Sequence, residues 1–384
     1  MLLGQTITVI GGGIAGLAVA LACARRGAAV TVLEQAPAIS EVGAGLQISP
    51  NGRVVLQALG LADGIAAGAP PLHAVSLRDF RRGAEVFRMP LSGPFHPVHR
   101  VDLIEALRGA AEAAGVTIRL GVRVTDVTVD GDEVRLTLAD GAEEVHGITL
   151  AADGLHSPAR KALNPRSRAL FTGQVAWRAT LPGRDLPPEA QVFMGPGRHL
   201  VRYPLRGGAQ TNIVAVEERD TWADEDWTLQ DDPKNLRAAF IDFPSEIREM
   251  LAEVTAPNLW GLARHPVAKT WHDGPLALLG DAAHPTLPFL AQGANMALED
   301  AWVLAACLAD DDSPIAAFTR YQATRKPRCH RIVEAANDNA TAYHLRPGPM
   351  RMAAHTALRL ANRFAPHVVA NRFAWVHRHD VTNG

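Results

Sequence analysis

Residues 11–16 near the N-terminus, Gly-Gly-Gly-Ile-Ala-Gly, have the spacing of a loop that holds a phosphate group. They follow an apolar run over 6–10, which is typical of a buried strand, and they open an apolar segment expected to be helical. Gly11 allows the tight turn, Gly13 lets the backbone approach a pyrophosphate, and Gly16 lets helix and strand pack closely. Because helix N-termini favour anions, the motif predicts a dinucleotide site. The residues expected to line it are Gly11, Gly13, Ile14, Ala15 and Gly16.

An acidic residue follows the next predicted strand, residues 29–33. Glu34 lies about 20 residues beyond the glycines, where a carboxylate accepts the hydroxyls of a ribose. A carboxylate at this place repels a 2′-phosphate, so FAD or NAD is favoured over NADP. Gln35 adjoins the same position and is included in the expected cofactor site.

Two further motifs also follow predicted strands. Residues 153–160 read Asp-Gly-Leu-His-Ser-Pro-Ala-Arg after the apolar run 148–152, and residues 280–285 read Gly-Asp-Ala-Ala-His-Pro after the strand 275–279. Asp281 is placed to accept sugar hydroxyls, or alternatively to cap the turn that follows it. Together with the glycine loop, these motifs predict a flavin dinucleotide.

The elements that position these motifs indicate an α/β fold with a discontinuous Rossmann-type domain. Residues 1–70, 97–168 and 273–310 are expected to form that FAD-binding domain, with a helix near 99–114 and strands over 116–120, 122–129 and 134–138. Short alternating segments broken by Pro and Gly predict an inserted antiparallel sheet, so a substrate domain is assigned to 71–96 and 169–272. Residues 311–384 are expected to be a helical C-terminal region.

Composition narrows the class of protein. The net charge of the 384 residues is −2, which does not suggest a nucleic-acid partner. The three cysteines have no metal-site spacing and are expected to be reduced. No apolar run is long enough to span a bilayer, and the first strand begins almost at once, so a cytoplasmic location without stable membrane association is expected.

The chain resembles the single-component FAD-dependent aromatic hydroxylases, the group that includes p-hydroxybenzoate hydroxylase, from about residue 5 to 340. Within the group it looks closest to salicylate hydroxylase, 3-hydroxybenzoate 6-hydroxylase and 6-hydroxynicotinate 3-monooxygenase. The resemblance implies tightly bound, non-covalent FAD, NADH or NADPH as a transient reductant, and O2 as co-substrate. It also implies a flavin C4a-hydroperoxide that hydroxylates a small phenolic aromatic, such as a hydroxybenzoate-like acid. The stretches that carry the resemblance are 11–18, 42–51, 153–160, 279–285 and 292–301.

The resemblance also assigns cofactor residues. Arg100 matches an arginine near the ribityl and phosphate groups, with a surface salt bridge as the alternative, and Val124 matches a strand residue that meets the adenine. Residues 288–295 match the loop beside the flavin ring, where Gly293 opens a helix whose N–H groups stabilise a reduced, negatively charged flavin. Asp153 lies near FAD or pairs with Arg160 to fix its loop. The remaining implied cofactor residues are Gly45, Asp281, Pro288, Ala294 and Asn295.

Candidate substrate residues lie on the predicted strand 199–204. His199, Val201 and Tyr203 share one face because side chains alternate along a strand. In the resembled hydroxylases a similar His and Tyr pair binds the substrate phenol and helps to deprotonate it, and histidine suits that role. The alternative is a His and Tyr hydrogen-bonded within a sheet core. Gln292 is expected to be catalytic, with pocket positions at Gln47, Val201 and Pro288, and a structural amide remains the alternative for both glutamines.

Two rival functions stay open. One is a flavin monooxygenase of a lipid or quinone, for which the segment 350–379 would lie on a membrane surface; a docking or oligomer-forming helix is favoured there, and a homodimer is compatible with the sequence. The other is a flavoprotein that carries electrons without oxygenation. The run His377-Arg378-His379 reads as a helix-end polar cluster, so no metal is expected.

Overall fold

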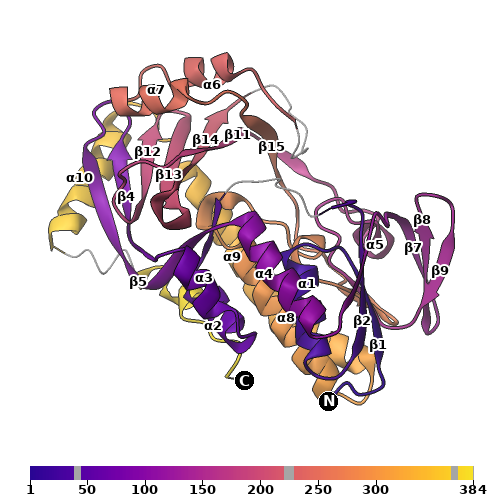
Figure 1. Cartoon of the computed structure of the whole chain (residues 1–384). Helices are drawn as coiled ribbons and strands as arrows, with labels where there is room; N and C mark the ends of the chain where they lie inside the picture. Colours follow the sequence, from indigo (N-terminus) through magenta and orange to yellow (C-terminus); the bar gives the residue numbers. More distant parts are fainter. Residues whose placement is uncertain (39–44, 220–228, 365–370, 384) are drawn as a thin grey trace.

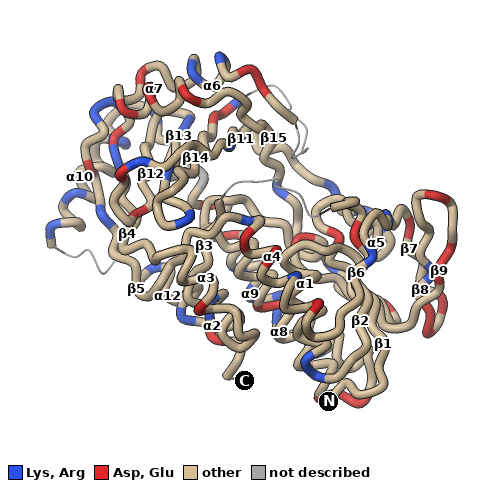
Figure 2. Tube along the Cα trace, viewed as in Figure 1, with Lys and Arg blue, Asp and Glu red and all other residues tan. Residues whose placement is uncertain are grey.

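The computed structural model describes residues 1–38, 45–219, 229–364 and 371–383. Two large sheets lie at opposite ends of a group of long helices (Figure 1). Basic and acidic residues are interspersed along the trace (Figure 2). The α/β class and the inserted sheet that the sequence predicts are confirmed.

The first sheet has six strands in the order β16-β17-β10-β1-β2-β6. All neighbouring pairs are parallel except β16–β17. Its central strands are apolar because other segments of the protein cover both faces of the sheet, as in other parallel sheets. The strands are β1 (Thr6–Ile10), β2 (Ala29–Glu34), β6 (Thr117–Leu120), β10 (Thr149–Ala151), β16 (His272–Asp273) and β17 (Leu276–Leu278).

Three helices pack together against this sheet. Helix α1 (Ile14–Ala24) contacts both α4 (Arg100–Ala113) and α8 (Gly293–Asp310), and nine of its eleven residues are buried. Apolar residues therefore occupy all sides of α1 rather than one stripe. The predicted helix near 99–114 is confirmed within one residue at either end.

The second sheet has eight strands in the order β15-β11-β14-β13-β12-β4-β5-β3. Its neighbours are antiparallel except for the parallel pair β4–β12. One face packs on α6 (Pro233–Ala239) and α7 (Ser245–Ala252) through a buried cluster that includes Trp177, Leu200 and Phe240. The strands are β3 (Gly45–Ile48), β4 (Leu72–Asp79), β5 (Glu85–His99), β11 (Leu170–Pro182), β12 (Glu189–Gly195), β13 (Arg198–Leu205), β14 (Gln210–Glu218) and β15 (Asn258–Arg264).

A small three-stranded sheet extends from the first domain, at the right of Figure 1. It consists of β7 (Val124–Asp130), β8 (Glu133–Leu138) and β9 (Glu143–His146). The predicted turn at Gly131 is confirmed, with a φ of +60°. The strand predicted from residue 122 begins instead at Val124.

The other helices connect or cover the sheets.

Cys23, Cys307 and Cys329 are free and buried, as expected. No helix within the described ranges is long and apolar enough to cross a membrane. The other α-helices are α2 (Pro50–Ala58), α3 (Ala62–Gly68), α5 (Pro158–Leu163), α9 (Pro314–Ala342), α10 (Pro349–Phe364) and α12 (Ala374–His377). The 3₁₀-helices are η1 (Arg206–Gly208), η2 (Gly280–Ala282) and η3 (Pro288–Leu290).

Candidate active site

The three motifs meet because their strands are neighbours. Ile10, the last residue of β1, is in register with Ala151 of β10, and Ala151 is in register with Leu278 of β17. Each motif begins within two residues of one of these strand ends, so all three loops lie at the carboxyl edge of one parallel sheet. Open α/β sheets bind their ligands at this edge.

The glycines of the first loop meet different requirements. Gly11 has a φ of +101°, and a Cβ on it would lie 2.4 Å from the carbonyl oxygen of Ala152. A Cβ on Gly16 would lie 1.8 Å from the carbonyl oxygen of Gly11. The Cβ position of Gly13, by contrast, has no described atom within 4 Å. The fold itself therefore requires Gly11 and Gly16, whereas Gly13 leaves open space at the start of α1.

Glu34 closes the same turn from the neighbouring strand. Its Oε2 accepts a hydrogen bond from the backbone N–H of Gly12 at 2.6 Å, and its Oε1 accepts one from Ala36 at 2.8 Å. The carboxylate is thus held against the glycine loop, at the place where a ribose acceptor is expected. The adjacent Gln35 is exposed.

The third motif packs directly on the first. Gly280 has a φ of +61°, and a Cβ there would approach the Cβ of Ala15 to 2.9 Å. Asp281, the next residue, is exposed within η2. Asp281 therefore directly follows the residue that packs against the first turn of α1.

The second motif holds its loop without an Asp153–Arg160 pair. Arg160 donates instead to the carbonyl oxygens of Ala282, Ala283 and Pro266, and so ties α5 to the third motif. Asp153 accepts a long 3.4 Å bond from the N–H of Ala159, while its Oδ1 is buried without a partner in the described part of the chain. Burial raises the pKa of Asp153 to about 6.

Helix α8 begins at Gly293, as expected, beside a buried cluster of amides. Gln292 donates from Nε2 to Oγ of Ser49 at 3.0 Å and accepts at Oε1 from Asn51 at 3.1 Å. Asn295 binds the backbone N–H of Ser49 and the carbonyl oxygen of Gln47. These bonds fasten β3 to the start of α8. The Gln292 amide bonds on both sides, as the structural alternative expects, and its catalytic role stays a prediction.

A buried ionic network supports α8, and it was not predicted. Asp300 binds Nε2 of His284 and accepts from Nε of Arg325 at 2.8 Å, while the Glu299 carboxylate accepts from Arg325 and Arg328. The Asp300 carboxylate overcomes the opposing effect of burial and raises the pKa of His284 well above its ordinary value. His284, Asp300 and Cys329 are spaced as metal ligands could be. Arg325 already supplies the positive charge beside the Asp300 carboxylate, so we interpret the cluster as structural.

The inner face of the second sheet carries the expected substrate residues. His199 is buried on β13, with its ring 5.7 Å from that of Phe289 in η3 and 5.2 Å from that of Tyr343, measured between centroids. Burial, followed by the charge of His344, lowers the pKa of His199 well below its ordinary value. The structure thus places His199 against the loop that continues into α8.

Tyr203 lies further along the same face. It is buried beside Gly45, whose Cβ position is 3.0 Å from the tyrosine ring, and the N–H of Gly45 donates to Oδ1 of Asn212 at 2.8 Å. Val201 lies between His199 and Tyr203, half-buried. Burial raises the pKa of Tyr203 above its ordinary value, although Arg178 opposes the shift.

Arg178 is a residue that the sequence analysis did not single out. Its cross-strand neighbour on β14 is Val214, which in turn pairs with Val201 on β13, so Arg178 points from the same face as His199 and Tyr203. Its guanidinium stacks 4.3 Å from the ring centroid of Trp260. Burial, with Arg100 adding a second positive charge nearby, lowers the pKa of Arg178 to about 10. A second positive charge near Arg178 favours the binding of an anion beside it.

The comparisons with known proteins agree with this geometry. Residues 5–336 match the family model described as FAD binding domain. A 3-hydroxybenzoate 6-hydroxylase of Polaromonas naphthalenivorans is 36% identical over 88% of either chain. A 3-amino-4-hydroxybenzoate 2-monooxygenase of Streptomyces platensis is 33% identical, covering 97% of this chain and 95% of that protein.

The chain belongs to the FAD-dependent aromatic hydroxylases. The solved structure of a salicylate hydroxylase substrate complex shares the fold, with a TM-score of 0.83, 23% identity, and coverage of 99% of this chain and 96% of that one. The family that the sequence analysis named is therefore confirmed, and FAD is the cofactor of this hydroxylase.

The residues at the sheet edge of this hydroxylase fit FAD. Within the described ranges, neither α1 nor α8 has a side-chain cap at its N-terminus, so both leave backbone donors for a ligand. The open space at Gly13 and the unpartnered oxygen of Asp153 lie on the same side of the sheet. Arg100 and Val124 are half-buried where α4 and β7 begin. Residues 42–44 of one matching stretch lie outside the described residues.

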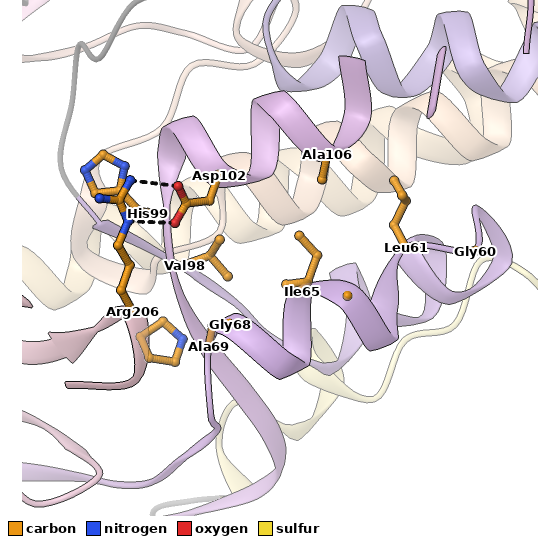
Figure 3. Close-up of a pocket in the computed structure, with 12 residues that line it drawn as sticks. Gly60, Leu61, Ile65, Gly68, Ala69, Val98, His99, Asp102, Ala106 and Arg206 are labelled. Atoms are coloured by element: carbon orange, nitrogen blue, oxygen red, sulfur yellow. Dashed lines mark hydrogen bonds and ion pairs between the residues drawn. The ribbon is translucent and has the colours of Figure 1, made fainter. Parts of the chain in front are cut away.

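A cavity of about 310 Å³ in this hydroxylase lies elsewhere, between α3 and α4. Figure 3 shows Arg206 and Asp102 joined at its rim, where two hydrogen bonds measure 2.7 and 2.9 Å. None of its lining residues is among the expected cofactor or substrate positions.

Proposed function

We propose that this enzyme hydroxylates a small aromatic acid that already carries a phenolic hydroxyl, with NADH or NADPH as the reductant. The bound FAD, once reduced, supplies the activation of O2. The proposal is carried by one observation: His199 and Tyr203 stand on the inner sheet face, and His199 touches Phe289 of the loop that leads into α8. The curated relatives, whose names specify hydroxybenzoate substrates, support the same substrate class.

His199 is the proposed base for the phenolic hydroxyl. The burial that depresses its pKa keeps the imidazole neutral near pH 7, so its free nitrogen can take the phenol proton. The resulting phenolate is a more electron-rich ring, and it reacts more readily with an electrophilic oxygen. Tyr203 keeps its proton because its pKa is raised, so it acts as a hydrogen-bond partner and not as a second base.

Arg178 is the proposed partner of the substrate carboxylate. It lies on the same face as His199 and Tyr203, and an anion beside it would offset its repulsion with Arg100. A guanidinium suits a carboxylate because the two match as a bidentate pair. Gln47, Val201 and Pro288 are proposed to line the pocket, whereas Gln292 positions the flavin loop through Ser49 and Asn51.

The deciding experiment measures NADH and NADPH oxidation by the purified holoenzyme across a panel of aromatic acids, with product masses recorded. The panel includes 3-hydroxybenzoate, 3-amino-4-hydroxybenzoate and salicylate, together with benzoate as the acid that lacks a hydroxyl. We expect one phenolic acid to stimulate oxidation and to gain a single oxygen atom. If only quinones or lipids are oxygenated, or if oxidation proceeds without any oxygenated product, the proposal is wrong.

A further inference from the structure

A line of three side chains runs from His199 to the protein surface. Nδ1 of His199 lies 2.7 Å from Nε2 of His344, and Nδ1 of His344 lies 2.9 Å from Oε1 of Glu218. The two imidazoles are buried, whereas the Glu218 side chain is 42% exposed. The three residues come from β13, from the chain just after α9, and from the end of β14.

The tautomers follow from the carboxylate at the outer end. A carboxylate accepts hydrogen bonds and cannot donate them, so the proton between His344 and Glu218 belongs to Nδ1 of His344. The Nε2 of a neutral His344 is then an acceptor, and Nδ1 of His199 must donate to it. This order leaves the lone pair of His199 on Nε2, which is the nitrogen that a base needs.

Backbone contacts fix this line of residues in place. The turn between β12 and β13 donates the N–H of Gly197 to the carbonyl oxygen of His344, and Gly197 accepts from the N–H of Glu218. The groups that face the imidazoles from the neighbouring elements are Tyr343, Phe289 of η3 and the amide of Gln174 on β11, which is 3.3 Å from His344. Among these described neighbours, Glu218 is therefore the acidic side chain in contact with the pair of imidazoles, at His344.

We propose that His344 and Glu218 form a proton relay that carries the substrate's phenolic proton from His199 to solvent. Nε2 of His199 takes the phenol proton as Nδ1 releases its own to Nε2 of His344. His344 then passes its Nδ1 proton to the Glu218 carboxylate, which exchanges it with water. Each imidazole gains and loses one proton, so both stay neutral overall and no oxidant is needed. This proposal rests on the function proposed above for His199.

The relay explains how a base can work inside a dry site. A buried imidazolium is costly, and the same burial lowers the pKa values of His199 and His344. Without an outlet, the proton taken from the phenol would remain as that unfavourable charge. Passing it on to Glu218 moves the charge change to a group in contact with solvent.

The test follows the proton directly. Holoenzyme in weak buffer with phenol red is mixed in a stopped-flow instrument with 3-hydroxybenzoate, or with the acid that the panel identifies. We expect wild-type enzyme to release about one proton per bound phenol in a fast phase. Glu218→Gln and His344→Ala should slow that phase about tenfold or more while the affinity for the acid changes little. Free imidazole should restore the rate in His344→Ala, which a purely structural role would not allow.

Glu217→Gln is the matched control. Glu217 is the preceding residue on β14, points to the opposite face and pairs with Arg219 at 3.0 Å. It should release the proton at the wild-type rate. If Glu218→Gln and His344→Ala also do so while His199→Asn does not, the relay is wrong and the role of His199 stands. If wild-type enzyme binds the phenolic acid, in the absence of NADH and NADPH, without releasing a proton, the proposed deprotonation itself fails.

A second measurement needs no aromatic ligand. Nitrogen-15 histidine labelling of the holoenzyme reports which ring nitrogen of each imidazole carries the proton. We expect Nδ1–H on both His199 and His344, and a changed His199 signal in His344→Ala. A proton found on Nε2 of His199 would overturn the relay.

Discussion

The backbone N–H of Gly12 donates to the carboxylate of Glu34 over 2.6 Å. The bond joins the phosphate-binding turn to the end of the next strand, and the second carboxylate oxygen accepts from Ala36. Glu34 is therefore oriented before any cofactor arrives, so less ordering is required when FAD binds. A site arranged in advance gains affinity in this way.

Replacing Glu34 with glutamine should weaken FAD binding about tenfold. The amide keeps one acceptor oxygen but puts an NH2 group where Gly12 or a ribose hydroxyl now donates, and a hydrogen bond to a charged group contributes about 1.5–3 kcal/mol. Titration of apoenzyme with FAD, followed by flavin fluorescence, measures the change. Glu105→Gln, an exposed carboxylate on α4, is the control. Equal affinity in Glu34→Gln and wild type would contradict this account of the site.

The two glycines Gly11 and Gly13 should respond differently to alanine. A Cβ on Gly13 meets no described atom within 4 Å, so Gly13→Ala should leave the melting temperature of the apoenzyme almost unchanged while it weakens FAD binding. Gly11→Ala places a Cβ 2.4 Å from the Ala152 oxygen at a φ of +101°, so it should destabilise the apoenzyme itself. Thermal unfolding with and without FAD separates the two effects. Equal loss of apoenzyme stability in both variants would refute the distinction.

The pH profile of the enzyme should reflect the depressed pKa of His199. A base must be unprotonated, so kcat/KM falls only as pH drops through the folded-state pKa, which lies well below 6.5. We expect the acid limb of the profile below pH 6.5, and kcat for the phenolic acid to fall about 100-fold or more in His199→Asn. Steady-state kinetics between pH 5 and about 8, where histidines titrate, give the profile. An acid limb above pH 6.5 would show that another group limits the reaction.

Arg178→Gln should raise KM for a hydroxybenzoate far more than for the parent phenol, which has no carboxylate. A lost charged hydrogen-bond pair corresponds to about a tenfold change or more. Comparing the two ligands within one variant controls for general damage to the pocket. Arg184→Gln, in the loop that follows β11, is the control for the loss of an arginine elsewhere. Parallel losses for both ligands would mean that Arg178 supports the sheet and does not bind the carboxylate.

Asp300→Asn should destabilise the protein by about 3–5 kcal/mol, because it leaves His284 buried without its carboxylate and Arg325 with Glu299 alone. Urea unfolding of the holoenzyme measures the free energy. Asp310→Asn, at the exposed end of the same helix, is the matched control and should change stability little. A small effect at Asp300 would mean that Glu299 alone compensates Arg325.

The residues that the sequence predicted best are those whose signal is local. Gly11, Glu34 and Gly293 each stand at the junction of a strand or helix with a turn, and the chemistry of such a junction is readable within a few residues. The sequence assigned 71–96 to the sheet domain but did not delimit its strands, and within β5 Pro90, Pro94 and Pro97 weaken the strand pattern. β5 nevertheless continues through these prolines, because its partners β4 and β3 hold it in place.

The missed site residues depend on contacts between distant segments. His344 is 145 residues beyond His199, and no pattern near either residue indicates that they meet. Asp300 and Arg325 lie on two helices whose packing is settled only in three dimensions. Gln292 was singled out, but its bonds to Ser49 and Asn51, about 240 residues earlier, could not be predicted, and its catalytic role stays a prediction.

The neighbouring positions of β1, β10 and β17 also determine when the FAD site can form during protein synthesis. The glycine loop leaves the ribosome first, but the strand that completes its sheet edge ends at Leu278 and the helix beside it begins at Gly293. The first strands of the nascent chain therefore lack these partners until the segment from Leu276 to Gly293 has been synthesised. FAD can be captured only after this segment has been synthesised, so a chain that stops before residue 276 should emerge colourless and dependent on chaperones.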